Sequence, residues 1–166
     1  MREIQSEVRV RTEAPVHAVW DEIYPLDHLL ENVPTVVSWE PSVDGKRAAI
    51  VGWFARWPVA WRSLAGTAEV TEAVAPERLR WATTIPSLGL TSEGTFELAP
   101  LGLDETSLTY RGVLRCGDRY AGRLRHVLTG VLEGHLDAVA SRVATRAARR
   151  TLAERTLGQE AREQPD

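Results

Sequence analysis

The 166-residue chain has little cysteine and no long apolar run. Its single cysteine, Cys116, cannot form an internal disulfide, so a disulfide-stapled secreted scaffold is excluded. The first thirteen residues alternate charged and apolar side chains, unlike the apolar centre of a signal peptide. No stretch approaches the roughly 18 apolar residues of a membrane span. We therefore expect a cytoplasmic protein without an integral membrane segment.

Common catalytic and metal-binding signatures are also missing. The chain has no G-x-S-x-G, H-E-x-x-H, P-loop or G-x-G-x-x-G motif. Its histidines and its cysteine are scattered without the spacing of metal ligands. The formal net charge of −3 argues against a nucleic-acid binder, which usually carries a basic stripe. We expect no metal, no cofactor and no nucleic-acid partner.

What the chain does contain is an ordered series of patterns. A strand pattern over Glu3–Thr12 precedes a helix that starts at Pro15 and a short helical turn at Leu26–Glu31. Strands and turns then fill Thr35–Arg115, and one amphipathic helix follows from about Asp118 to Arg150. This order predicts an α+β fold, with the last helix packed on one face of an antiparallel sheet. A curved sheet around a single helix leaves part of its concave face uncovered, so we expect a cavity.

Turn signals divide the central region. Asp44-Gly45 is a strong hairpin signal, and dipeptides that contain proline interrupt the apolar runs elsewhere. The predicted strands are Val36–Glu40, Arg47–Arg56, Val59–Ala73, Leu79–Thr84, Leu90–Leu98 and Ser107–Arg115. Residues 1–150 are therefore expected to form one domain. Residues 151–166 are rich in Glu, Arg, Gln and Pro and are predicted to be a frayed or disordered tail.

The last predicted helix has one apolar side. At 100° per residue this side collects Tyr120, Leu124, Leu128, Val131, Leu132, His135, Ala138 and Val139. Gly130 and Gly134 fall on the flank of this side. Each glycine makes helix formation less favourable by about 1 kcal/mol relative to alanine. We expect these two glycines to allow a close approach of the helix to the sheet.

Two motifs carry a resemblance to a known family. The segment APVHAVW at Ala14–Trp20, and VTEAVAPERLRW at Val70–Trp81, are similar to the START-like polyketide cyclase/dehydrase and lipid-transport superfamily. The resemblance covers roughly residues 4 to 150. It implies the helix-grip fold: a curved seven-stranded antiparallel sheet wrapped around a long C-terminal helix, two short helices after the first strand, and a cavity. Members cyclise polyketides, carry lipids or quinones, sense hormones or stimulate chaperones, and the fold alone does not choose among these.

Three residues are candidates for catalysis. His135 lies in the apolar stripe of the last helix, either as a neutral imidazole bonded to a backbone carbonyl or as an acid–base group facing a ligand. Arg62 shares strand parity with Leu64, so it either snorkels to water or binds an oxygen of a ligand. Tyr110 could offer its hydroxyl to the cavity or be a satisfied core residue.

A second set is expected to line the cavity. These candidate ligand-binding residues are Ser92, Trp53, Trp57, Trp81, Phe96, Leu128 and Val131. Trp53, Trp57 and Trp61 crowd one hairpin, where they either fill the core, cover a planar ligand, or form a dimer or membrane-surface patch.

The sequence thus predicts a protein that binds a small hydrophobic or aromatic molecule. The first hypothesis is a polyketide cyclase or aromatase without metal or cofactor, in which Arg62 stabilises an enolate and His135 or Tyr110 moves a proton. The alternatives are a non-catalytic carrier or chaperone of a lipid, quinone or cofactor, and a protein-binding co-chaperone module. Whether a reaction is catalysed stays open, and a homodimer is possible.

Overall fold

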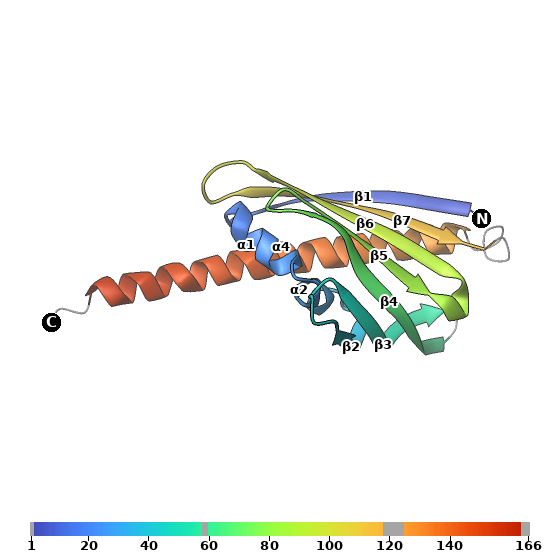
Figure 1. Ribbon diagram of the computed structural model, residues 1–166. Helices are drawn as coiled ribbons and strands as arrows, with labels where there is room; N and C mark the ends of the chain where they lie inside the picture. Colours follow the sequence, from blue (N-terminus) through green and yellow to red (C-terminus); the bar gives the residue numbers. More distant parts are fainter. Residues whose placement is uncertain (1, 58–59, 118–124, 164–166) are drawn as a thin grey trace.

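The computed structural model describes residues 2–57, 60–117 and 125–163, with the side chains of residues 3–53, 63–117 and 125–162. A curved seven-stranded antiparallel sheet in the order β1-β7-β6-β5-β4-β3-β2 wraps around the long helix α4 (Figure 1). Two short helices, α1 (Val16–Ile23) and α2 (Leu26–Glu31), connect β1 to β2. The predicted α+β helix-grip fold is confirmed.

The strands follow the predicted boundaries closely. They are β1 (Arg2–Thr12), β2 (Val36–Pro41), β3 (Arg47–Trp57), β4 (Ala60–Val74), β5 (Arg78–Ile85), β6 (Leu90–Pro100) and β7 (Thr106–Cys116). The turn at Asp44-Gly45 joins β2 to β3, and Gly45 adopts the left-handed conformation, with φ of 66°, that this signal predicts. A short 3-10 helix, η1 (Pro86–Leu88), lies between β5 and β6 and was not predicted.

Helix α4 (Arg125–Glu163) lies along the concave face of the sheet. Its inner side is a continuous apolar stripe at spacings of three and four residues. The buried members are Leu128, Leu132, Leu136, Val139, Val143 and Ala147. Residues 118–124, where the predicted helix begins, lie outside the described part of the chain.

The end of α4 differs from the prediction. The helix continues through Glu163, beyond the sheet and past the point at which the sequence predicts a frayed or disordered tail (Figure 1). Residues 152–162 are all exposed, so tertiary packing does not hold them. Alanine, leucine, glutamate, arginine and glutamine are strong helix formers, and they extend a helix that packing has already nucleated.

Helix α1 packs on α4, and α2 packs on α1 and on the strands β2 and β3. Val19, Ile23, Leu29 and Leu30 are fully buried there. Asn32, directly after α2, donates a 2.9 Å hydrogen bond to the backbone carbonyl of Glu22. This bond ties the segment after α2 to helix α1. The same segment leads on to the cavity described below.

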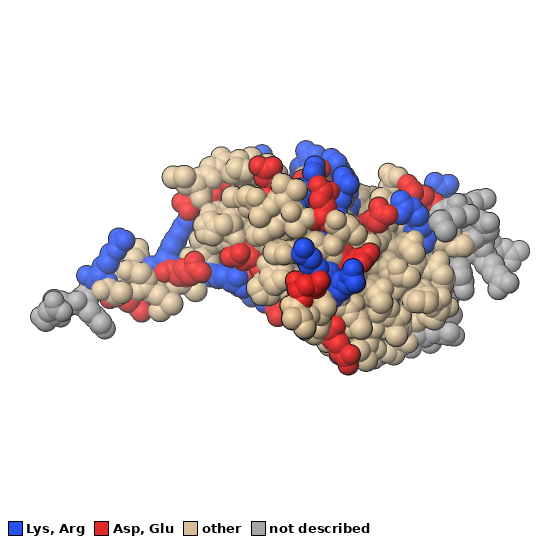
Figure 2. All heavy atoms as spheres, in the orientation of Figure 1, with Lys and Arg blue, Asp and Glu red and all other residues tan. Residues whose placement is uncertain are grey.

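The charged surface mixes both signs. Basic and acidic side chains are interspersed on the face shown in Figure 2. On the outer face of the sheet, for example, Glu3 on β1 pairs with Arg115 on β7 at 3.0 Å. Among the described residues, no helix is long and apolar enough to span a membrane. The same residues contain no cluster of three or more His, Cys, Asp or Glu side chains that could hold a metal ion.

Candidate ligand-binding cavity

A cavity of about 350 Å³ lies between α4 and the sheet. Its size is within the range of small-molecule sites, at the lower end. Helix α4 forms one wall with residues on a single face, namely Leu128, Val131, Leu132, Gly134, His135 and Ala138. The sheet forms the facing wall with Leu64, Thr83, Ile85, Leu90, Thr91, Ser92 and Leu114. The expected hollow between helix and sheet is therefore present.

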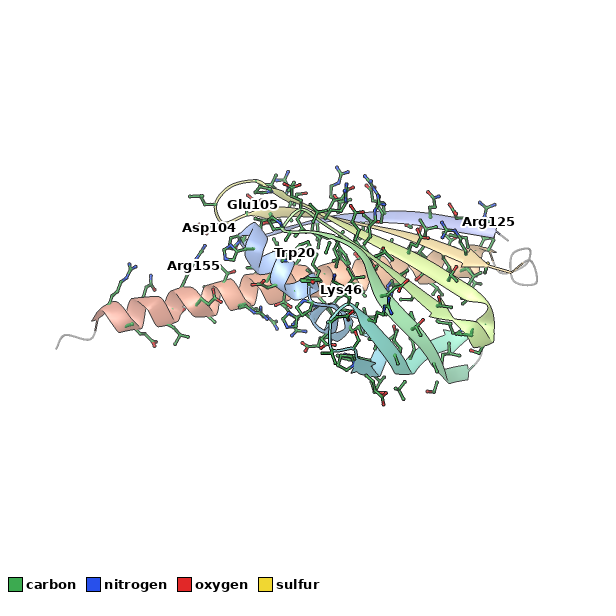
Figure 3. The ribbon with its side chains drawn as sticks, in the orientation of Figure 1. Trp20, Lys46, Asp104, Glu105, Arg125 and Arg155 are labelled. Carbon is green, nitrogen blue, oxygen red and sulfur yellow. The ribbon has the colours of Figure 1, made fainter. Side chains whose placement is uncertain are left out.

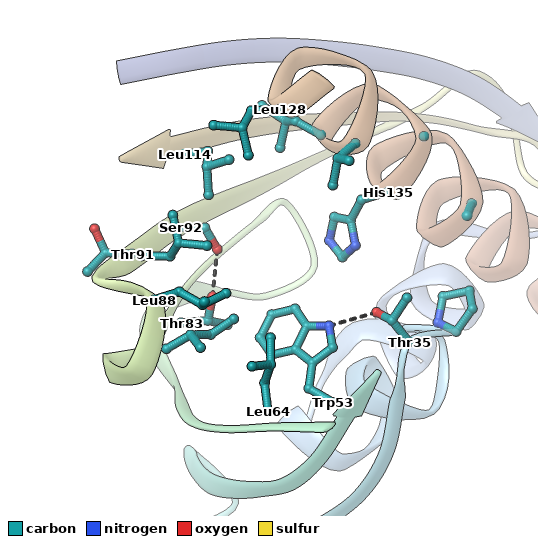
Figure 4. Close-up of a pocket in the computed structure, with 17 residues that line it drawn as sticks. Thr35, Trp53, Leu64, Thr83, Leu88, Thr91, Ser92, Leu114, Leu128 and His135 are labelled. Atoms are coloured by element: carbon teal, nitrogen blue, oxygen red, sulfur yellow. Dashed lines mark hydrogen bonds between the residues drawn. The ribbon is translucent and has the colours of Figure 1, made fainter. Parts of the chain in front are cut away.

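His135 is the titratable group of this wall. Its imidazole extends from α4 into the cavity, toward the indole of Trp53 (Figure 4). Desolvation lowers the pKa of His135 from 6.5 to about 4, so the ring is neutral at physiological pH. Within the described residues, no side chain or carbonyl forms a hydrogen bond with the ring, so the alternative of an imidazole tied to the backbone finds no support there. Both ring nitrogens can therefore serve a ligand.

Two hydroxyl groups form a second polar point on the sheet wall. Ser92 on β6 and Thr83 on β5 are cross-strand neighbours, and their hydroxyl oxygens lie 2.6 Å apart in a hydrogen bond. Both side chains line the cavity (Figure 4). Each hydroxyl can accept a further hydrogen bond, so this pair can bind a hydroxyl group of a ligand.

Trp53 supplies a flat apolar surface. Its indole Nε1 donates a 2.9 Å hydrogen bond to the hydroxyl of Thr35, in the connection between α2 and β2. This bond satisfies the polar edge of the indole and leaves its ring to the cavity. Pro34, beside Thr35, and Leu88 of η1 complete this part of the wall.

Three predicted site residues lie in the core instead of the cavity wall. Tyr110 and Phe96 are 1% and 0% exposed, and their rings stack at 3.9 Å. Trp81 is 3% exposed and covers Gly94. Burial also raises the pKa of Tyr110, which makes its hydroxyl a poorer acid. For Phe96 and Trp81 this corrects the expectation that they line the cavity, because strand parity shows which face a residue occupies but not how far along that face the helix packs. For Tyr110 it agrees with the alternative of a core residue.

Other predictions have mixed outcomes. Ser92, Trp53, Leu128, Val131 and His135 line the cavity together, and their roles toward a ligand stay predictions. The side chains of Arg62, Trp57 and Trp61 lie outside the described part of the chain, so their roles stay predictions.

Sequence reasoning missed several wall residues. Thr35 and Leu88 lie in connections, where strand parity gives no signal. Thr83 was overlooked as the cross-strand partner of Ser92, although the pairing of β5 with β6 could have revealed it.

The described lining residues of the cavity carry neutral groups at physiological pH. No Lys, Arg, Asp or Glu is found among the lining residues that the structure describes. Lys46, the chain's only lysine, lies in the β2–β3 turn (Figure 3), so no lysine can form a Schiff base in the cavity. The arrangement can stack a flat ring on Trp53, and donate or accept hydrogen bonds through His135, Ser92 and Thr83.

Comparison with known proteins supports the fold. The sequence profile of a family described as polyketide cyclase / dehydrase and lipid transport matches residues 1–148. No curated protein sequence matches the chain.

Solved structures of similar fold share little sequence. A conserved protein from Geobacillus kaustophilus is 17% identical, with a TM-score of 0.71 over 88% of this chain and 96% of that one. The Zhui aromatase/cyclase from Streptomyces sp. R1128 is 16% identical, with a TM-score of 0.68 over 90% and 96%. A norcoclaurine synthase point mutant from Thalictrum flavum is 13% identical, with a TM-score of 0.68 over 90% and 97%.

Proposed function

Because the chain belongs to the polyketide cyclase / dehydrase and lipid transport family, we propose that it binds a small hydrophobic or aromatic molecule in the cavity between α4 and the sheet and promotes its cyclisation. The observation that carries this proposal is the apolar cavity of about 350 Å³ with neutral polar groups on facing walls. A protein-binding module would instead have a filled interior. The aromatase/cyclase of similar fold supports the reaction class by analogy.

The cavity would act chiefly by holding the substrate in the conformation that reacts. Confining a flexible chain that carries carbonyl groups brings two of its carbons together, and proximity of this kind removes several kcal/mol of a barrier. His135 takes the proton from the carbon that becomes nucleophilic. That carbon then forms the new carbon–carbon bond to a carbonyl carbon of the same molecule, and the carbonyl oxygen receives the proton from the imidazolium. With a pKa of about 4, His135 is a weak base that returns its proton readily.

A second candidate function is non-catalytic carriage of a neutral hydrophobic molecule. It is favoured by the small polar content of the described lining, in which His135 is the titratable side chain. A carrier needs affinity but no proton transfer. The two functions therefore differ in what His135 does, and not in where the ligand binds.

Native mass spectrometry of the purified protein is the first test, because a bound molecule would be released and weighed. The molecule, or its open-chain precursor, is then incubated with the wild type and with His135→Gln. A cyclase converts the precursor, and the variant binds it but converts it at least about tenfold more slowly. A carrier returns the molecule unchanged in both cases. Absence of any bound molecule, together with no binding of neutral aromatic probes, would contradict both functions.

A further inference from the structure

We propose that Gly134 determines which ligands fit, because the ligand's flat ring system packs against the backbone of α4 at this residue. The inference rests on the proposed binding function and names the class of ligand: two or three fused rings that carry a neutral oxygen group. The largest ligand that the cavity accepts would then be set by the absence of a side chain at Gly134.

The first argument is that no described residue packs against Gly134. A Cβ atom built on Gly134 meets no atom of the described residues within 4 Å. The same holds for Gly130, so the prediction that these glycines let the helix approach the sheet is wrong. A Cβ on Gly112 of β7 would lie 2.8 Å from Leu136 Cδ2 and 3.0 Å from Leu132 Cδ1. The close approach of sheet and helix is therefore provided by Gly112.

The second argument is the position of Gly134 within the cavity wall. Val131, His135 and Ala138, which lie three residues before, one after and four after it, all line the cavity. Gly134 and Ala138 are one helical turn apart on the same face, so two small residues form a depression in the helix wall. Glycine is among the least favourable residues inside a helix, and here the neighbouring structure does not require it. Gly134 is exposed on the side of the helix that lines the cavity, so in this proposal its role is to keep space for a ligand open.

The third argument concerns the shape of the space. The indole of Trp53 is held by its bond to Thr35 and lies across the cavity from α4 (Figure 4). A flat ring system can lie between this indole and the depression at Gly134. His135, beside Gly134, is then in reach of an oxygen on that ring system. A volume of about 350 Å³ suits a ligand of two or three fused rings and leaves little room for more.

The test uses a ladder of neutral hydroxyarenes: 2-naphthol, 2-anthrol and 1-hydroxypyrene, with two, three and four rings. Binding to the wild type, Gly134→Leu and Gly130→Leu is measured by probe fluorescence and calorimetry. Gly130 is a matched control, because it lies on the same helix in the same open surroundings but does not line the cavity. Both substitutions should raise Tm by about 2–4 °C through helix propensity, which shows that both variants fold.

For the wild type we expect binding of 2-naphthol and 2-anthrol and no binding of 1-hydroxypyrene. Gly134→Leu should weaken 2-anthrol at least about tenfold and 2-naphthol less than about threefold, while Gly130→Leu should change neither. Equal affinities in the two variants would overturn the role of Gly134 and leave the binding function standing. Wild-type protein that binds none of the three probes would overturn both.

Discussion

The carboxylate of Glu22 on α1 lies 2.9 Å from the guanidinium of Arg150 on α4, with the glutamate side chain only 2% exposed. Arg146, one turn earlier on α4, approaches the other oxygen of the same carboxylate at 3.4 Å. A charge this buried requires partners, since desolvation of an ion is expensive. Asn32 binds the backbone of Glu22, so the same network links α4 to the segment that carries Thr35. Thr35 in turn accepts the hydrogen bond from Trp53 in the cavity wall.

Removing this buried charge should destabilise the fold. Glu22→Gln loses both ionic contacts, and we expect the free energy of unfolding to fall by about 1–3 kcal/mol. Urea denaturation with an unchanged m-value measures this loss. Glu31→Gln is the matched control, because Glu31 pairs with the same Arg146 at 2.9 Å but is 46% exposed. The control should change stability by at most about 1 kcal/mol, and equal losses would show that burial of Glu22 is irrelevant.

Gly94→Ala should be more damaging than its small size suggests. A Cβ at this position would lie 2.2 Å from Nε1 of Trp81 and 2.9 Å from the Tyr110 ring. Both rings are fully packed, so neither can move without disturbing the core, and we expect a loss of about 2–3 kcal/mol. Thermal and urea unfolding check this value. Gly102→Ala, where a Cβ meets nothing within 4 Å, should leave stability nearly unchanged. A Gly94→Ala protein as stable as wild type would refute the packing of Trp81 on this strand.

His135 should make stability depend on pH. Its pKa is about 4 in the folded protein and 6.5 when exposed, so between these values the unfolded chain binds a proton that the folded chain does not. The free energy of unfolding therefore falls as pH falls from 6.5 to 4, by at most about 3 kcal/mol. Urea titrations at pH 7.5 and 4.5 should show a drop about 2 kcal/mol larger for wild type than for His135→Gln. Other acid-sensitive groups, such as Glu3 and Glu7, cancel in this comparison. Parallel profiles for the two proteins would mean that His135 is not desolvated.

Most of the fold follows from local sequence signals. Proline and Asp-Gly turn signals predicted the strand ends to within a few residues, and the 3.6-residue period predicted the inner face of α4. The 3-10 turn at Pro86–Leu88 was missed, because three residues carry too little periodicity. The extension of α4 to Glu163 was missed for another reason: composition showed that residues after Thr151 cannot form a core, but an exposed helix needs none.

The site was harder to predict than the fold. Parity placed Ser92 and Phe96 on the same face of β6, yet Ser92 lines the cavity and Phe96 lies in the core. The difference depends on where α4 covers the sheet, a three-dimensional relationship that no single strand encodes. The buried position of Glu22 was likewise invisible, since its partners lie more than 120 residues away in the chain.

The projecting end of α4 should be dispensable for the fold. A chain that ends at Ala153 loses exposed residues and the Arg155–Asp104 ion pair of 2.5 Å, whose partners are 51% and 67% exposed (Figure 3). Such a pair contributes at most about 1 kcal/mol, so Tm should stay within about 3 °C of the full chain. A chain that ends at Ala144 also loses the buried Ala147 and both arginines that hold Glu22, and it should unfold without a cooperative transition. Circular dichroism melts of the two chains decide this, and a large Tm loss in the longer one would show that the projecting helix packs on something the fold requires.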